Sequence, residues 1–247
     1  MIKEQEKQLF SSWEKDHTFD LFLKDGIFDE DEWNNQPIKI LYVLKEANFK
    51  TNNQEKNKKD TLTISDFCND LCNYLLSEKS PTYWKTWNNI VRWTQAIRYG
   101  GEYQRTITKA DKTKCLKTIA ALNIKKEAGS AVANNEEILQ YGKRDAEYLR
   151  QQIELYQSDI IICCGRGTGK NADILHDYVL KNVSDWQKPI ETYNYFLCRL
   201  DSSKIVPVIS FRHPQIRGGH VAYEKSYLDM MTIATEMRNR KHIGTNI

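Results

Sequence analysis

The sequence predicts an α/β fold: a three-layer α/β/α sandwich around a central, mostly parallel four-stranded sheet, with an N-terminal helix and helical insertions. Short and almost wholly apolar runs, such as Ile38–Leu44, are typical of strands buried on both faces of a parallel sheet. These runs alternate along the chain with helical patterns, and this alternation favours helices on both sides of the sheet. The 247 residues, of which 40% are hydrophobic, suffice for one sizeable domain.

The expected domain spans 1–247, with a helical N-terminal extension over 1–35 and a flexible loop over 49–63. The loop prediction rests on Phe49–Asp60, which is rich in Asn and Lys and has no apolar period. The aromatic block Thr82–Trp93 repeats its apolar residues at helical spacing, which indicates core packing rather than base stacking. Strands are expected at 38–44, 118–124, 159–164 and 204–211, and the segment 192–200 should pair with the last of them as an edge strand. Helices are expected at 2–24, 64–78, 83–98, 135–156, from the third strand to about 183, and at 222–240.

Composition argues against membrane and disulfide-rich classes. The first ten residues are too charged for a signal peptide, and no apolar run approaches the roughly 18 residues of a membrane span. We therefore expect a cytoplasmic monomer with no membrane partner. The formal net charge is only +3, but 36 Lys and Arg residues allow basic patches and a polyanionic partner. The six cysteines form no CxxC pair, so we expect free thiols and no metal or other cofactor.

The glycine-rich turn Gly165–Lys170 follows an apolar run and precedes a helical pattern, as a phosphate-binding P-loop does. A P-loop has four residues between its first glycine and the Gly-Lys pair, and Ser or Thr after the lysine binds magnesium. Here the spacing is three residues and Asn171 follows Lys170. A nucleotide enzyme of this kind is therefore the third of three functional readings.

Polar segments follow each of the four main strands, where ligands of parallel sheets bind. In chain order, ILYVLKEAN, ALNIKK, YLRQQIELYQSDIIICCGRGT and VISFRHPQIR resemble the motifs of the uracil-DNA glycosylase superfamily over about residues 38–217. The chain resembles a divergent bacterial member without the iron–sulfur ligands. The resemblance implies a monofunctional DNA glycosylase that hydrolyses the N-glycosidic bond of a flipped-out pyrimidine and leaves an abasic site. It also implies that the glycine turn is a scaffold and DNA-backbone element.

This chemistry requires a positioned water, a group that stabilises the cationic sugar and a donor to the leaving base. Glu46 matches the Glu of the iron–sulfur branch's first motif. The resemblance implies that Glu46 positions the water and stabilises the cationic sugar. Lys45 and Asn48 depart from that motif, and Asn48 could itself orient the water. His213 suits the donor to the base, and Asn123 can read a pyrimidine edge because its amide offers a donor and an acceptor. Phe49 and Phe67 are the candidate stacking platforms for a flipped base.

Contacts to the DNA backbone are expected from basic and glycine residues at the same strand ends. The Asp-Pro-Tyr-His signature of the best-known uracil-specific branch is absent, so the substrate is uracil or, by preference, a modified pyrimidine such as a modified cytosine in phage DNA. Some superfamily members are thought to attack phage DNA, and this analogy adds antiviral defence to base excision repair as a role; the sequence leaves the choice between the two open. The alternative to a glycosylase is a non-catalytic nucleic-acid-binding relative. The expected DNA contacts are Lys45, Arg166, Lys170, Arg212, Arg217, Gly218 and Gly219.

Overall fold

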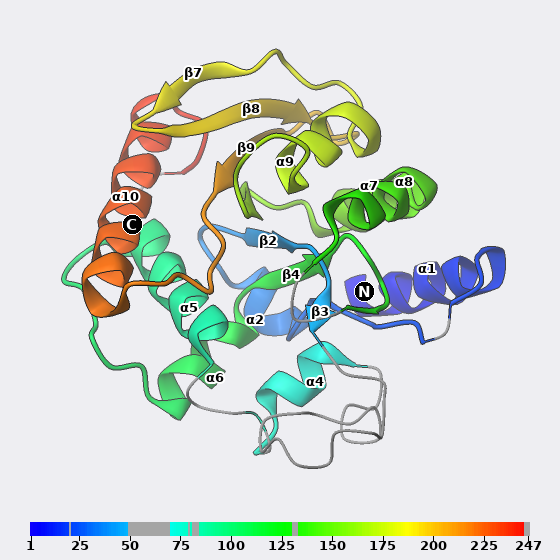
Figure 1. Ribbon diagram of the computed structural model, residues 1–247, viewed down its shortest axis with the longest axis horizontal. Coiled ribbons are helices and arrows are strands. Elements are labelled where there is room, and N and C mark those ends of the chain that lie inside the picture. Colours follow the sequence, from blue (N-terminus) through cyan, green and yellow to red (C-terminus); the bar gives the residue numbers. More distant parts are fainter. Residues whose placement is uncertain (20, 49–69, 79, 81–83, 130–132, 245–247) are drawn as a thin grey trace.

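The computed structural model describes residues 1–19, 21–48, 70–78, 80, 84–129 and 133–244. Its centre is a mixed seven-stranded sheet with strand order β1-β4-β2-β6-β9-β8-β7 (Figure 1). The four central strands run parallel: β4 (Ala120–Asn123), β2 (Ile40–Leu44), β6 (Ile160–Cys164) and β9 (Ile205–Phe211). The α/β class is confirmed, and these four strands lie within the predicted runs.

The sheet is larger than the four strands predicted for it. Strand β1 (Gly26–Ile27) pairs antiparallel with β4, and β8 (Tyr193–Arg199) and β7 (Gln187–Ile190) extend the other edge in antiparallel fashion. The edge strand β8 was predicted. Strand β1 has only two residues and is too short to produce a pattern. Strand β7 exposes two of its four residues and contains a proline, so it does not have the apolar sequence of a central strand.

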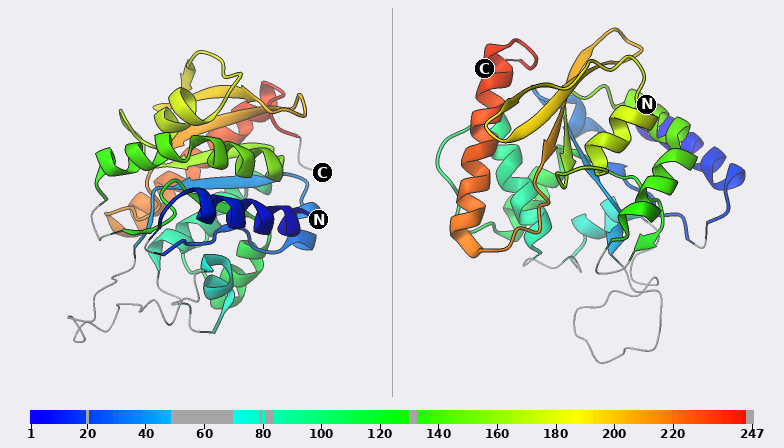
Figure 2. Two further views of the ribbon diagram at one scale, coloured as in Figure 1. Left: turned by 90° about the vertical axis from the view of Figure 1, so that its right-hand side faces the viewer. Right: turned by 45° about the horizontal axis from the view of Figure 1, so that its top comes forward.

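Helices cover both faces of the sheet, as the right-hand view of Figure 2 shows. One face packs against α5 (Lys85–Arg98) and α10 (Gly219–Asn239), and the other packs against α1 (Ile2–Asp16) and α8 (Ala146–Tyr156). Side chains of a strand alternate between the two cores, so Tyr42 and Ile162 face α5 while Leu41 and Ile161 face α8. Both faces of the central strands are therefore buried, which explains why their sequences are almost wholly apolar, with Asn123 at the end of β4 and Ser210 in β9 as polar residues.

Several helix boundaries differ from the predicted ones. The predicted helix 135–156 divides into α7 (Asn135–Arg144) and α8 at Asp145, whose side chain is buried and pairs with Arg144 and His17. The helix after β6 is short: α9 (Asn171–Ile174) passes into a π-helical turn, Leu175–Val179, and the chain becomes extended at Leu180. Helix α1 ends at Asp16 rather than near 24, and α10 begins at Gly219. Two helices, α2 (Glu30–Asn34) and α6 (Lys109–Lys117), were not predicted.

Other predictions concern single side chains. The aromatic block does pack into the core, since Trp87 and Trp93 on α5 are buried. Five cysteines are free thiols, and Cys68 lies outside the described residues. Among the residues that are described, no helix has the length and apolar character to cross a membrane. The segment of the predicted helix 64–78 that is described contains α4 (Leu71–Leu76), whereas the whole of the predicted loop 49–63 lies outside the described residues.

Candidate functional site

The carboxyl ends of the central strands meet at one edge of the sheet. Beyond the strands, the main chain of 124–125 stays bonded to that of 44–45, with Ile124 donating to the Leu44 carbonyl at 3.1 Å and Lys125 donating to the Lys45 carbonyl at 2.8 Å. A small parallel sheet continues this contact, because β3 (Ala47–Asn48) pairs with β5 (Ala128–Gly129). The segments that follow β2 and β4 are thus held side by side.

Glu46 lies in this junction with its carboxylate turned inward. Its side chain is only 5% exposed, and Oε2 lies 3.5 Å from Nζ of Lys125. Oε1 is buried and has no hydrogen-bond partner among the described residues. Burial raises the pKa of Glu46, and the positive charge of Lys125 opposes that rise. The carboxylate therefore combines one oxygen anchored by Lys125 with one buried oxygen that has no partner in the described chain.

Gly129 makes this position of Glu46 possible. A Cβ atom at residue 129 would lie 1.8 Å from Cδ of Glu46, so the carboxyl group occupies the space of the missing side chain. Lys125 is held in turn by Glu137 on α7, whose Oε1 lies 2.5 Å from its Nζ, and by the ring of Tyr141 at 5.1 Å. Lys125 and Gly129 were not predicted as site residues. A lysine placed directly after a buried strand was the only sequence signal for Lys125.

Asn123 and Lys126 bind the buried carboxylate of Asp25 rather than facing outward at the carboxyl ends of the strands. The main-chain N–H and the side-chain amide of Asn123 both donate to Oδ2 of Asp25, at 2.7 and 3.1 Å. Lys126 is fully buried and pairs with Oδ1 of the same carboxylate at 2.5 Å, and Gln152 donates to that oxygen. Of the side-chain atoms of Asn123, the acceptor Oδ1 has no partner in the described chain. This geometry favours a structural role at the strand end over reading a base.

His213 follows β9 and its ring orientation is defined by its own loop. The main-chain N–H of Gln215 donates to Nδ1 of His213 at 3.1 Å, so the neutral imidazole carries its proton on Nε2. Burial lowers the pKa of His213 and nearby Lys45 lowers it further, although the residue remains exposed overall. At neutral pH the ring is therefore an uncharged donor through Nε2.

The loop of His213 is anchored to helix α5. Buried Asn89 donates from Nδ2 to the carbonyl of Pro214 at 2.7 Å, and Arg92 donates to Oδ1 of Asn89 at 2.9 Å. Arg92 also donates to the carbonyls of Gln104 and Arg105, which fixes its guanidinium. These residues were not predicted, because only the tertiary structure brings α5 to the loop after β9.

Two lysines from different strand ends lie beside the glycine turn. Lys45 donates to Oδ1 of Asn135 at 2.8 Å, and a Cβ atom at Gly167 would lie 3.9 Å from Cγ of Lys170. Burial lowers the pKa of Lys45, and the like charge of Lys170 lowers it further. A Cβ atom at Gly165 would lie 3.7 Å from Cε of Lys45, so the turn passes directly under this side chain.

The glycine turn is not arranged as a nucleotide cradle. The N–H of Gly169 donates to Oδ2 of Asp173 at 2.7 Å, and the N–H of Gly165 donates to the carbonyl of Phe211 at 2.9 Å. Asn171, where a P-loop has Ser or Thr, is buried and donates to the carbonyls of Val43 and Cys164. Asn171 thus joins the ends of β2 and β6, and an internal carboxylate occupies one of the amides that would otherwise face a phosphate.

The predicted arginine contacts fall into two groups. Arg212 donates to Asp229 at 2.7 Å and to the Tyr193 hydroxyl, so its charge is already paired inside the protein. Arg166 is exposed, donates to Thr192 at 3.0 Å and lies 5.4 Å from the Tyr193 ring centroid. Arg217 is exposed just before α10, next to Gly218 and Gly219, which have φ angles of 106° and 67°. Arg166 and Arg217 remain available to a partner.

Three predicted residues cannot be placed as side chains. The main chain of Asn48 pairs with Gly129 in the small sheet, and its side chain is outside the description. Phe49 and Phe67 lie outside the described residues.

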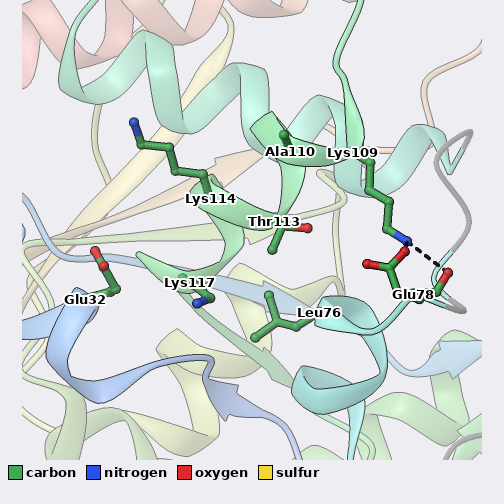
Figure 3. A pocket seen from close by; sticks show the side chains of 8 residues that line it. All are labelled: Glu32, Leu76, Glu78, Lys109, Ala110, Thr113, Lys114 and Lys117. Carbon is green, nitrogen blue, oxygen red and sulfur yellow. Dashed lines mark hydrogen bonds and ion pairs between the residues drawn. The ribbon is translucent and has the colours of Figure 1, made fainter.

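A pocket of about 600 Å³ lies away from these strand ends (Figure 3). Glu32 and Lys117, which line it, come just before β2 and β4, so it opens near the amino ends of the strands. Lys109 on its wall is paired with Glu78 at 2.5 Å. The pocket is open to the surface, and none of the predicted site residues lines it, so it is a surface hollow rather than the site of the proposed chemistry. Its lining is Glu32, Leu76, Glu78, Lys109, Ala110, Thr113, Lys114 and Lys117.

Comparisons of the chain with protein-family models, with curated proteins and with solved structures return no match.

Proposed function

We propose that the protein is a monofunctional DNA glycosylase that releases a flipped-out pyrimidine and leaves an abasic site. The observation that carries the proposal is the Glu46 carboxylate, which is buried, anchored by Lys125 on one oxygen and without a described partner on the other. A buried unpartnered carboxylate oxygen is costly for stability, and such groups are concentrated at functional sites. The strand-end motifs that resemble the uracil-DNA glycosylase superfamily supply the reaction class.

In the proposed reaction, Oε1 of Glu46 accepts a hydrogen bond from a water molecule. The C1′–N bond of the nucleotide breaks and its electron pair leaves with the base. The water oxygen attacks C1′, and its proton passes to Glu46. The negative charge of the carboxylate also stabilises the cationic sugar that develops as the bond breaks. The raised pKa of Glu46 suits this task, because a carboxylate that is more basic accepts the proton more readily.

The leaving base carries negative charge, and His213 is the proposed donor to it. Its neutral ring has a proton on Nε2, because Nδ1 accepts from Gln215. A hydrogen bond from Nε2 to the pyrimidine O2 strengthens as the charge develops on the base. The released anion then takes a proton from solvent. The lowered pKa of His213 keeps the ring in this neutral donor form at pH 7.

The proposed substrate is a modified pyrimidine in DNA, with uracil as the simpler case. Asn48, Phe49 and Phe67 remain proposed contacts to the water and the flipped base. The internal bonds of Asn123 to Asp25 leave only its Oδ1 for a base. Among the proposed backbone contacts, Arg166 and Arg217 are exposed, whereas Arg212 is engaged with Asp229.

The test is an abasic-site assay on DNAs that contain uracil, hypoxanthine, hydroxymethylated cytosine or glucosylated cytosine. We expect one of them to be cleaved in excess EDTA and without ATP, and we expect Glu46→Gln to lower the rate by about two to three orders of magnitude. DNA binding without base release on the whole panel would favour the non-catalytic relative. Base release that strictly requires magnesium or ATP would overturn this mechanism.

A further inference from the structure

Glu137 on α7 is the outer member of three charged side chains that lead inward to Glu46, and the proposed reaction gives it no role. Nζ of Lys125 lies between the two carboxylates, 2.5 Å from Oε1 of Glu137 and 3.5 Å from Oε2 of Glu46. The side chains of Glu46 and Lys125 are 5% and 7% exposed, whereas that of Glu137 is 41% exposed. One buried ammonium group is therefore shared by two carboxylates, and the acid nearer the surface holds it more closely.

Helix α7 presents two side chains to this lysine from one face. Glu137 and Tyr141 are four residues apart, so they lie one above the other on the helix surface. The ammonium group of Lys125 lies 5.1 Å from the centroid of the Tyr141 ring. The Tyr141 hydroxyl donates in turn to the carboxylate of Glu127. An acid and an aromatic ring of the same helix thus fix the position of the lysine.

Gly142 lets α7 lie close to the segment that carries the lysine. A Cβ atom at residue 142 would lie 2.5 Å from Cγ2 of Ile174 on α9 and 3.3 Å from Cγ2 of Ile124, which directly precedes the lysine. At the other end of the helix, the side-chain oxygen of Asn134 caps the first turn. Glu137 therefore belongs to a closely packed helix, and its position relative to the lysine is set by the fold.

Three charged side chains act on the Glu46 carboxylate from the elements around it: Lys125 after β4, Glu137 on α7 and Lys45 beside it in the chain. The two lysines favour the ionised carboxylate, whereas the negative charge of Glu137 favours the protonated form. Without Glu137, the whole charge of Lys125 would act on Glu46 and weaken its hold on a proton. A general base needs that hold, because it takes a proton from the attacking water.

We propose that Glu137 is a positioning residue for Glu46 and acts through Lys125: the lysine holds one carboxylate oxygen in place, and Glu137 balances the charge of the lysine so that Glu46 remains a base. Lys125 alone would also hold the carboxylate, but it would make Glu46 a weaker base. The role of Glu46 as the base rests on the proposed glycosylase function. The coupling of the three side chains does not.

The first experiment measures the ionisation of Glu46 without any substrate. The NMR resonance of its carboxyl carbon, assigned by its absence in Glu46→Gln, is followed as the pH is changed. Glu137→Gln should move the midpoint of this titration toward acid by about one pH unit, because it removes a negative charge and releases Lys125 to Glu46. Lys125→Met should move the midpoint toward alkali by about one to two pH units, because the buried carboxylate loses its positive neighbour.

Glu136→Gln is the matched control, because it removes an exposed acid from the same turn of α7. It should leave the titration midpoint of Glu46 nearly unchanged. The result for Glu137→Gln decides the inference even if Lys125→Met, which leaves a buried acid unpaired, is too unstable to titrate. A midpoint that moves toward alkali in Glu137→Gln would mean that Glu137 only holds the lysine in place, and it would overturn the balancing role.

The second experiment measures single-turnover base release by the same variants. Glu137→Gln should slow the reaction by about threefold to tenfold, because a carboxylate that holds a proton less firmly is a poorer base. It should add almost nothing in the Glu46→Gln background, because Glu137 acts only through Glu46. Glu136→Gln should retain the rate of the unaltered protein. A loss of the same size in both backgrounds would overturn the inference, because Glu137 would then support the site in some other way.

The two experiments separate the failure of this inference from the failure of the proposed function. Equal titration midpoints of Glu46 in Glu137→Gln and Glu136→Gln, with base release intact, would overturn the inference and leave the glycosylase standing. Absence of base release from every DNA, with the midpoint moving in opposite directions in Glu137→Gln and Lys125→Met, would overturn the glycosylase and support the coupling of the three side chains.

Discussion

Replacing Gly129 with alanine tests the position of the Glu46 carboxylate directly. The added Cβ would lie 1.8 Å from Cδ of Glu46 and about as close to both carboxylate oxygens, whereas real Cβ contacts are not found below 3.0 Å. The carboxyl group must therefore move by roughly 1 Å or more, and a displacement of that size costs on the order of 100-fold in rate. The φ angle of Gly129 is not in the left-handed range, so the effect comes from the contact and not from backbone strain.

The assay is single-turnover base release by Gly129→Ala, Glu46→Gln and the double variant. We expect Gly129→Ala to slow the reaction by about 100-fold and to add almost nothing in the Glu46→Gln background, because both changes act on one carboxylate. Gly244→Ala is the control, since no atom lies within 4 Å of its added Cβ. Full activity of Gly129→Ala, or losses that multiply in the double variant, would refute the role of Glu46 derived from this geometry.

Three further predictions address charge. Burial raises the pKa of Glu46 above 4.5, so the folded protein favours the protonated carboxyl group, and ionisation of Glu46 at neutral pH lowers the free energy of unfolding. Glu46→Gln should therefore raise Tm at pH 7 by about 2–4 °C, measured by calorimetry. A lower Tm would contradict this. The rate of base release should decline as the pH falls below 6.5 toward 4.5, because the reaction requires an ionised Glu46 and a neutral His213, whose pKa is lowered. A rate that rises on acidification would contradict these roles. Arg217→Ala should weaken DNA binding equally for all bases and reduce the slope of log K against log salt by about one unit, as for one lost phosphate contact, and a change in base preference at constant slope would place Arg217 in the base pocket instead.

The positions of the strand-end segments were predictable from the sequence. The buried parallel strands have almost wholly apolar sequences because both of their faces are covered, so the predicted runs contain β2, β4, β6 and β9 at nearly their actual bounds. A strand that ends must be followed by a loop at the carboxyl edge, and this placed Glu46, Lys170 and His213 at one edge of the sheet before any coordinates were known.

The elements that the sequence does not predict each have an identifiable physical cause. Strand β1 has two residues and cannot display a period. At the break between α7 and α8, the buried carboxylate of Asp145 lies 3.6 Å from Nε2 of His17, a residue far away in the sequence. Helix α6 carries mostly polar residues and few apolar ones, so its sequence has no clear amphipathic stripe.

The α/β class, the central strands and the polar residues at their ends follow from the amino-acid sequence. The partners of those polar residues follow from the folded arrangement, in which Asn123 and Arg212 bind internal acids and one oxygen of Glu46 has no described partner. The physical reason is that hydrophobic periodicity is a property of one segment, whereas hydrogen bonds and ion pairs between side chains join segments far apart in the chain. Asp25 lies 98 residues before Asn123, and no local sequence pattern predicts the hydrogen bond between them.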